Sequence, residues 1–125
     1  MDLGETFLLK TPPKGNHLFV VAIPLSSSTF LLLPVVSFKE YLEQVCVLEP
    51  SAELPDFIEH QSVVDYQNAR HVSQYSLDDM QARGYCTPKG MLSSRVHMKI
   101  LNGALASKRI TKQNKRLIRE FLNTQ

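Results

Sequence analysis

Three polar side chains stand where the first two apolar runs of the chain begin or end. Lys14 and His17 lie in and after a turn of sequence Thr-Pro-Pro-Lys-Gly-Asn, and Ser37 follows the second apolar run. A histidine can take or give a proton near neutral pH, so His17 could act as an acid or a base. Lys14 could steady a phosphate, and the Ser37 hydroxyl could donate to a phosphate or an oxyanion. These residue types predict phosphate chemistry, although each also fits an ordinary polar position at a strand end or turn.

Further candidates lie around the next apolar segment. Alternation along a strand would place Ser62, Val64 and Tyr66 on one face. Tyr66 could then stack on a nucleotide base, or it could be half-buried with its hydroxyl at the rim. Arg70 could pair with Asp65 or with a phosphate. The sequence leaves both pairs of alternatives open.

The net charge of +2 is unevenly distributed. Residues 1–90 hold six Lys or Arg and eleven Asp or Glu, so their net charge is about −5. Residues 91–125 hold eight Lys or Arg and one Glu, so their net charge is about +7. This asymmetry favours an anionic partner for the C-terminal part. The basic residues that could hold a nucleic acid are Lys108, Arg109, Lys112, Lys115, Arg116 and Arg119. A solvated helix face, a membrane surface and the acidic body of a second copy are the alternatives.

Composition predicts one small globular domain in a reducing compartment. The chain has 125 residues, 43% of them hydrophobic, and its apolar runs are too short to span a bilayer. The two cysteines lie far apart and no secretory leader is recognisable, so we expect free thiols and a cytoplasmic protein. Nucleotide loops, nucleophile elbows and zinc motifs are absent, and the four histidines lack metal-ligand spacing. We therefore expect no cofactor, no metal and no membrane contact.

Hydrophobic periodicity predicts the elements that position these residues. Strands are predicted over 18–24, 30–36, 43–48, 61–66 and 69–72. Pro34 predicts that the second strand is an edge strand or ends there, because proline cannot donate to a ladder. Pro55–Ile58 is predicted to anchor a hydrophobic corner, and a short helix over 77–83 should end at Gly84.

After residue 90 the apolar period changes from 2 to 3.6. Ser93 or Ser94 can cap one helix and Thr111 a second. The fold class is therefore α+β, with a small barrel or sandwich over 1–90 and a basic helical arm over 91–125 that packs on it or extends from it.

The order of four segments resembles the PemK/MazF-like toxins. These segments are GNHLFVVAIP (15–24), LLLPVVSF (31–38), QSVVDYQNARHVSQYSL (61–77) and GMLSSRVHMKILNGAL (90–105). The resemblance implies a small SH3-like β-barrel followed by C-terminal helices. It also implies a dimeric endoribonuclease that cuts single-stranded RNA without a metal and has an antitoxin-like protein partner.

In that family a basic residue after the first turn and a hydroxyl after the next strand act on the scissile phosphate. By position these correspond to His17 and Ser37, with Lys14 beside them. The family usually has arginine where this chain has Asn16-His17. The alternative hypothesis is a non-catalytic barrel that binds nucleic acid or a protein partner through its basic helical tail.

Overall fold

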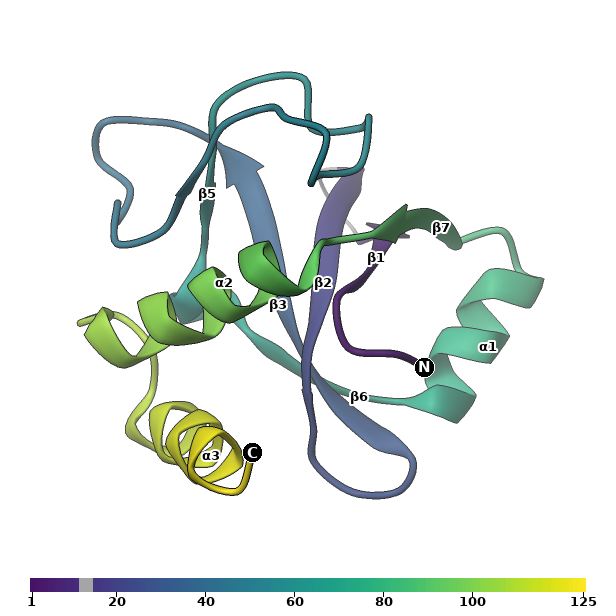
Figure 1. Cartoon of the computed structure of the whole chain (residues 1–125). Coiled ribbons are helices and arrows are strands. Elements are labelled where there is room, and N and C mark those ends of the chain that lie inside the picture. The colour runs from purple at the N-terminus through teal and green to yellow at the C-terminus, as the bar shows by residue number, and fades with distance from the viewer. Residues whose placement is uncertain (12–14) are drawn as a thin grey trace.

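The fold of the computed structural model is α+β, as the sequence predicts. Residues 1–11 and 15–125 are described, and within them seven antiparallel strands and three α-helices are found (Figure 1). In chain order the elements are β1 (Glu5–Lys10), β2 (Asn16–Pro24), β3 (Thr29–Ser37), β4 (Val47–Leu48), β5 (Ser62–Val64), the 3-10 turn η1 (Tyr66–Asn68), β6 (Arg70–Ser73), α1 (Gln74–Ala82), β7 (Cys86–Met91), α2 (Ser94–Ala106) and α3 (Lys112–Asn123).

The strands form one sheet in the order β4-β5-β3-β2-β1-β7, with β6 pairing β3 as well. One edge of β3 therefore has two partners: its first half pairs with β6 and its last three residues with β5. Pro34 lies between these two pairings. Its carbonyl accepts a hydrogen bond from the Asp65 amide, so its nitrogen faces the gap where no ladder donor is needed. The prediction of an edge strand or a strand end at Pro34 was therefore wrong.

Both faces of the sheet are covered, because β2 and β3 are apolar on both sides. Leu18, Val20 and Leu33 face a core that includes Ile100 and Leu101 of α2. The alternate residues of the same strands, among them Phe19, Val21 and Leu32, face a second core closed by Leu77 of α1. Figure 1 shows α2 crossing one face and α1 standing at the end of the sheet beside β7. Continuous apolar runs are the expected pattern for strands buried on both faces.

The basic C-terminal segment packs on the sheet. Ile110 and Ile118, together with α2, belong to the first core, and the hydroxyls of Ser93 and Thr111 cap α2 and α3 as predicted. The arm predicted over 91–125 therefore shares its core with the body over 1–90. Among the described helices, none has the length and apolar character that a bilayer crossing requires.

A β-bulge at Ala22 connects the sheet to α2. Val21 pairs with Leu32 and Ile23 with Leu31, which leaves Ala22 as the extra residue. Its carbonyl accepts a hydrogen bond from Nε2 of His97 at 2.8 Å. His97 is thus a structural donor, with its proton on Nε2.

Gly103 of α2 allows the close approach of Tyr66. The Tyr66 hydroxyl donates to the Ile100 carbonyl at 2.7 Å, and a Cβ on Gly103 would overlap that hydroxyl and lie 3.0 Å from Cys46 Cβ. Gly→Ala inside a helix ordinarily stabilises by about 1 kcal/mol. Here we expect Gly103→Ala to destabilise by about 1–3 kcal/mol in urea unfolding, because the hydrogen-bonded tyrosine must move.

Asn102→Ala is the matched control for this prediction, because Asn102 is exposed on the same turn of α2. This variant should be neutral or slightly stabilising. A Gly103→Ala protein as stable as the wild type would show that α2 does not need the close approach.

Candidate functional site

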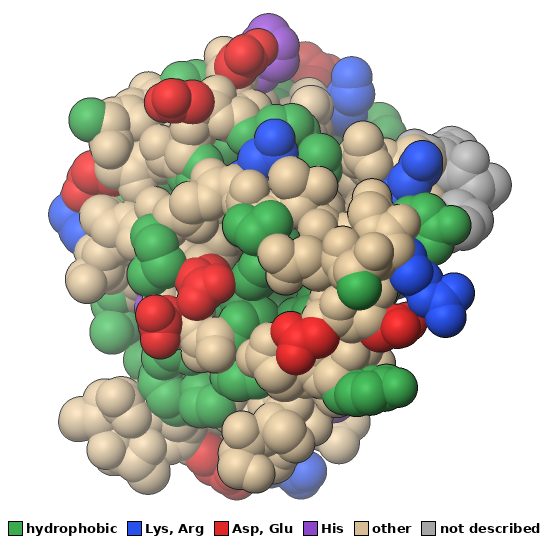
Figure 2. Space-filling model, turned by 90° about the vertical axis from the view of Figure 1, so that its right-hand side faces the viewer, with side chains coloured by type: hydrophobic (Ala, Val, Ile, Leu, Met, Phe, Trp, Pro, Cys, Tyr) green, Lys and Arg blue, Asp and Glu red, His purple; other side chains and the backbone are tan. Residues whose placement is uncertain are grey.

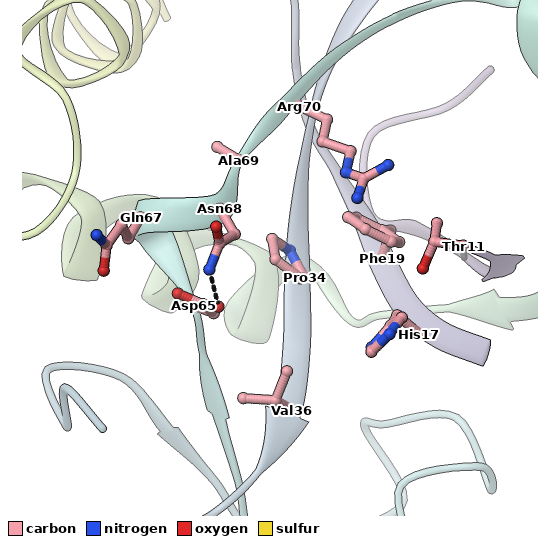
Figure 3. A pocket seen from close by; sticks show the side chains of 10 residues that line it. All are labelled: Thr11, His17, Phe19, Pro34, Val36, Asp65, Gln67, Asn68, Ala69 and Arg70. Atoms are coloured by element: carbon pink, nitrogen blue, oxygen red, sulfur yellow. Dashed lines mark hydrogen bonds between the residues drawn. The ribbon is translucent and has the colours of Figure 1, made fainter. Parts of the chain in front are cut away.

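The depression beside η1 brings together residues from four elements. It has a volume of about 420 Å³, and Figure 3 shows His17 of β2 and Arg70 of β6 on one side, with Asp65 and Asn68 on the other. The full lining is Thr11, His17, Phe19, Pro34, Val36, Asp65, Gln67, Asn68, Ala69 and Arg70. The floor lies at Pro34, in the gap that β5 and β6 leave along β3. The same proline that interrupts the ladder therefore makes room for the depression.

Arg70 is held over an aromatic ring. Its guanidinium carbon lies 5.4 Å from the centroid of the Phe19 ring, and Figure 3 shows the side chain extending from β6 across that ring. Among the described residues no ion pair joins Arg70 to an acidic group. Asp65 instead accepts a hydrogen bond from the Asn68 amide at 2.7 Å. The guanidinium is therefore oriented by stacking while its donors stay available to an anion.

His17 and Ser37 line a second depression of about 630 Å³ at the same end of the sheet. Leu18 pairs with Val35, so His17 comes one residue before this pair and Ser37 two residues after it. His17 is half-buried and Ser37 is exposed. Both residues that the resemblance singles out therefore lie at this end of the sheet and line the depression, with Ser37 on the strand face of Leu18 and Val35 and His17 on the face of Phe19. Lys14, the third member of that set, lies outside the described residues.

Tyr66 is not available to a nucleotide base. β5 ends at Val64 and the chain turns into η1, so the alternation that the sequence suggested stops before Tyr66. The side chain is 1% exposed, and burial raises the pKa of its hydroxyl far above the ordinary value. The prediction of Tyr66 as a stacking residue was therefore wrong, because the ring belongs to the core.

The predicted basic residues of the C-terminal segment fall into two groups. Lys115 donates to the Ser107 carbonyl at 2.7 Å and Arg109 to the Tyr41 carbonyl at 3.1 Å, so both have partners in the fold. The other four are exposed and make no ion pair with any described acidic side chain: Lys108, Lys112, Arg116 and Arg119. These four are the cations that α3 and the turn before it present to solvent.

The face made by α1 and the N-terminal segment differs in charge from α3. Figure 2 shows acidic and basic side chains interspersed on this face, and Asp2, Asp78, Asp79 and Arg83 are exposed there. A face of mixed charge should attract a polyanion less than the cations of α3 do. Exposed residues of α1 therefore serve as controls for binding experiments.

Both thiols are buried. Burial raises the pKa of Cys46 and of Cys86 above the ordinary value, and neither forms a disulfide. A raised pKa disfavours the thiolate, so neither cysteine is poised as a nucleophile. Among the described residues, no three His, Cys, Asp or Glu side chains are grouped as metal ligands would be.

Glu53 fixes the loop between β4 and β5 to the start of α2. Its carboxylate accepts hydrogen bonds from the Ser93 hydroxyl at 3.1 Å and from the Arg95 guanidinium. The bonds from Arg95 lower the pKa of Glu53 below its ordinary value of 4.5. The attachment is therefore complete above that value and is lost as the pH falls through the lower pKa of the folded protein.

We expect acid to release this loop before the sheet unfolds. Amide hydrogen exchange in residues 49–61 should accelerate as Glu53 is protonated, and Glu53→Gln should show the faster exchange already at neutral pH. Equal exchange in the two proteins at neutral pH would contradict the role of Glu53.

Sequence reasoning missed Phe19 as the support for Arg70, and it missed Gln67 and Asn68. The signal for the last two was the run Gln-Asn-Ala before Arg70, where polar residues follow the expected strand. The sequence does not mark Phe19 as a site residue, because it lies within a continuous apolar run. No model of a known protein family matches the chain, and a search of curated proteins finds no significant relative.

Proposed function

We propose that this protein is a PemK/MazF-like, metal-independent endoribonuclease that acts on single-stranded RNA in the cytoplasm. The observation that carries the proposal is one depression lined both by His17 and by an arginine that has no acidic partner among the described residues. Cleavage that starts from a 2′-hydroxyl needs a group that accepts its proton and a cation that binds the adjacent phosphate.

Arg70 would supply what the usual arginine supplies in that family. A histidine cannot make the bidentate contact to phosphate that an arginine makes. Arg70 reaches the depression from β6 and is oriented by Phe19. His17 would then accept the proton and Arg70 would stabilise the phosphate charge. Ser37 and Lys14 would contribute further hydrogen bonds or charge to the phosphate.

The reaction is a transfer within the RNA strand. His17 takes the proton of the 2′-hydroxyl, the 2′ oxygen forms a bond to phosphorus, and the bond from phosphorus to the 5′ oxygen breaks. The 5′ oxygen takes a proton from water, and His17 gives up the proton it accepted to the hydroxide that remains. The products carry a 2′,3′-cyclic phosphate and a 5′-hydroxyl. Arg70 and Ser37 stabilise the charge that gathers on the phosphoryl oxygens.

The direct test is cleavage of one sequence as RNA and as DNA in EDTA. We expect the RNA to be cut to cyclic-phosphate ends and the DNA to stay intact, because DNA has no 2′-hydroxyl. Cleavage of both strands, or of neither, would contradict the proposal.

A small SH3-like barrel is part of the same proposal. It is supported by the double pairing of β3 and by the irregular ladders β2–β3 and β1–β7, since bulges bend a sheet toward closure. In the described residues β4 and β7 end the sheet without pairing to each other, so the barrel would be an open one. A homodimer and an antitoxin-like partner also belong to the proposal, and sedimentation of the purified protein tests the first.

The exposed cations of α3 support RNA binding outside the depressions at His17. If Lys112, Arg116 and Arg119 each meet a phosphate, converting all three to Gln should reduce the slope of log K against log salt by about 2. Arg83→Gln on α1 is the control, because Arg83 already pairs with Asp79. An unchanged slope in the triple variant would remove α3 from the RNA surface.

The same surface supports the second candidate, a non-catalytic nucleic-acid-binding protein. Salt-sensitive binding that the α3 variant loses, together with intact RNA in every cleavage assay, would favour it over the nuclease.

A further inference from the structure

The two depressions at His17 adjoin each other, because both are lined by His17, Val36 and Asp65. We call the pair the groove, with Arg70 at one end and Tyr41 and Phe57 at the other. The Arg70 end offers cationic and amide donors. The far end is different in kind, because it is lined by Tyr41 and Phe57 with Lys39 beside them.

Tyr41 presents an exposed ring on an anchored backbone. Its side chain is 75% exposed, whereas its carbonyl accepts a hydrogen bond from Arg109 at 3.1 Å. Two residues later, the Glu43 carboxylate accepts hydrogen bonds from the Ser107 hydroxyl at 2.6 Å and from the Lys108 backbone amide at 2.8 Å. The loop between β3 and β4 is thereby tied to the turn between α2 and α3.

Phe57 is placed in a similar way by the loop between β4 and β5. Leu54 and Ile58 are each 6% exposed and hold the loop in the core, while Phe57 between them remains 46% exposed. The segment Pro55–Ile58, predicted to anchor a hydrophobic corner, does so through Ile58, with Leu54 beside it in the same core, whereas Phe57 stays outside that core. The ammonium of Lys89 lies 5.6 Å from the centroid of the Phe57 ring.

Single exposed aromatic residues are common on protein surfaces and need no explanation. Here two of them, from two separate loops, line one groove together with an imidazole and a lysine. Figure 1 shows both loops at the end of the sheet where β2 begins and β3 ends. Aromatic rings beside cations are how proteins bind single strands, since every base has a face to stack on and every phosphate a charge.

We propose that Tyr41 and Phe57 are the base-stacking side of this groove and bind single-stranded RNA whose backbone runs past His17 to Arg70. This inference rests on the proposed function and deepens it. It assigns the bases to the Tyr41 end and the reacting phosphate to the Arg70 end. Duplex RNA is excluded as the ligand, because its base faces are already stacked on one another.

The experiment measures binding of 2′-O-methyl RNA about 8 nucleotides long. This RNA has no free 2′-hydroxyl, so wild-type protein binds it without cutting it. We expect Tyr41→Ala and Phe57→Ala each to weaken binding by about 5- to 150-fold. Tyr41→Phe and Phe57→Tyr, which keep a ring, should bind as the wild type does, and so should Tyr75→Ala, a control on α1 that is 81% exposed.

A spectroscopic signature separates stacking from a merely structural role. The chain has no tryptophan and four tyrosines, so its emission comes from tyrosine. RNA should quench part of this emission, and Tyr41→Phe should lose that part while it keeps its affinity.

Alanine variants that bind as tightly as the wild type, or equal affinity for duplex and single strand, would overturn the inference. Because the probe cannot be cleaved, the result is independent of catalysis. A protein that binds through Tyr41 and Phe57 but cuts no RNA would leave this inference standing and end the nuclease proposal. A wild-type protein that cuts RNA, together with alanine variants of Tyr41 and Phe57 that bind the probe as tightly as the wild type, would end this inference and leave the nuclease proposal standing.

Discussion

Replacing His17 by alanine is expected to slow cleavage of single-stranded RNA by about 100- to 10,000-fold. The reason is that the 2′-hydroxyl then has no acceptor for its proton within the groove. His17 is half-buried at the start of β2 and belongs to neither hydrophobic core, so the fold should survive. The measurement is the single-turnover rate in EDTA at protein concentrations that saturate the RNA.

His60→Ala is the matched control for this result. His60 is exposed in the loop before β5 and lines neither of the two depressions that contain His17. It should cleave at the wild-type rate. Wild-type cleavage by the His17 variant would remove this residue from the chemistry, even if the protein were still a nuclease.

Replacing Arg70 by alanine is expected to reduce cleavage by about 10- to 100-fold, since a hydrogen-bonded contact to a charged group contributes about 1.5–3 kcal/mol. Arg70→Lys keeps the charge but loses the planar fork and the stacking on Phe19, so it should recover only part of the rate. Rates at saturating and at limiting protein concentration separate lost binding from lost transition-state stabilisation.

Arg83→Ala on α1 removes an exposed arginine that pairs with Asp79 away from the two depressions, and it should leave the rate unchanged. Thermal melting of the Arg70 variants detects any loss of packing against Phe19. Full activity of Arg70→Lys would show that a positive charge at this position is enough for cleavage and that the planar guanidinium has no role of its own.

The sequence predicts the centre of the sheet well, because burial on both faces makes β2 and β3 continuous apolar runs. The helices are also predicted, since Ser93 and Thr111 cap patterns of the right period. β1 and β7 are not predicted. β7 carries a proline and a glycine and is mostly exposed, so only its pairing with β1 makes it a strand.

The site is less predictable than the sheet, because it depends on contacts between distant parts of the chain. Phe19 and Arg70 are far apart in sequence and meet only because β6 pairs with β3. Tyr66 was misassigned for a related reason. Strand alternation was extended two residues too far, past the point where β5 gives way to η1.

His17 and Ser37 are predicted as site residues because they precede or follow apolar runs, and those runs form the neighbouring strands β2 and β3. Their residue types and positions predict phosphate chemistry, but the sequence does not indicate which cation would bind the phosphate beside them. From the sequence, Arg70 could form an ion pair either with Asp65 or with a phosphate. The structure gives Asp65 a hydrogen bond from Asn68 instead, and among the described residues no ion pair joins Arg70 to an acidic group.

The central claim is that single-stranded RNA lies in the groove between His17 and Arg70. Amide chemical shifts of the isotopically labelled wild-type protein, followed as uncleavable 2′-O-methyl RNA is added, test it directly. We expect the largest changes at His17, Phe19, Val36, Asn68 and Arg70, with α1 unchanged. Saturable binding that leaves these five amides unmoved would contradict the account.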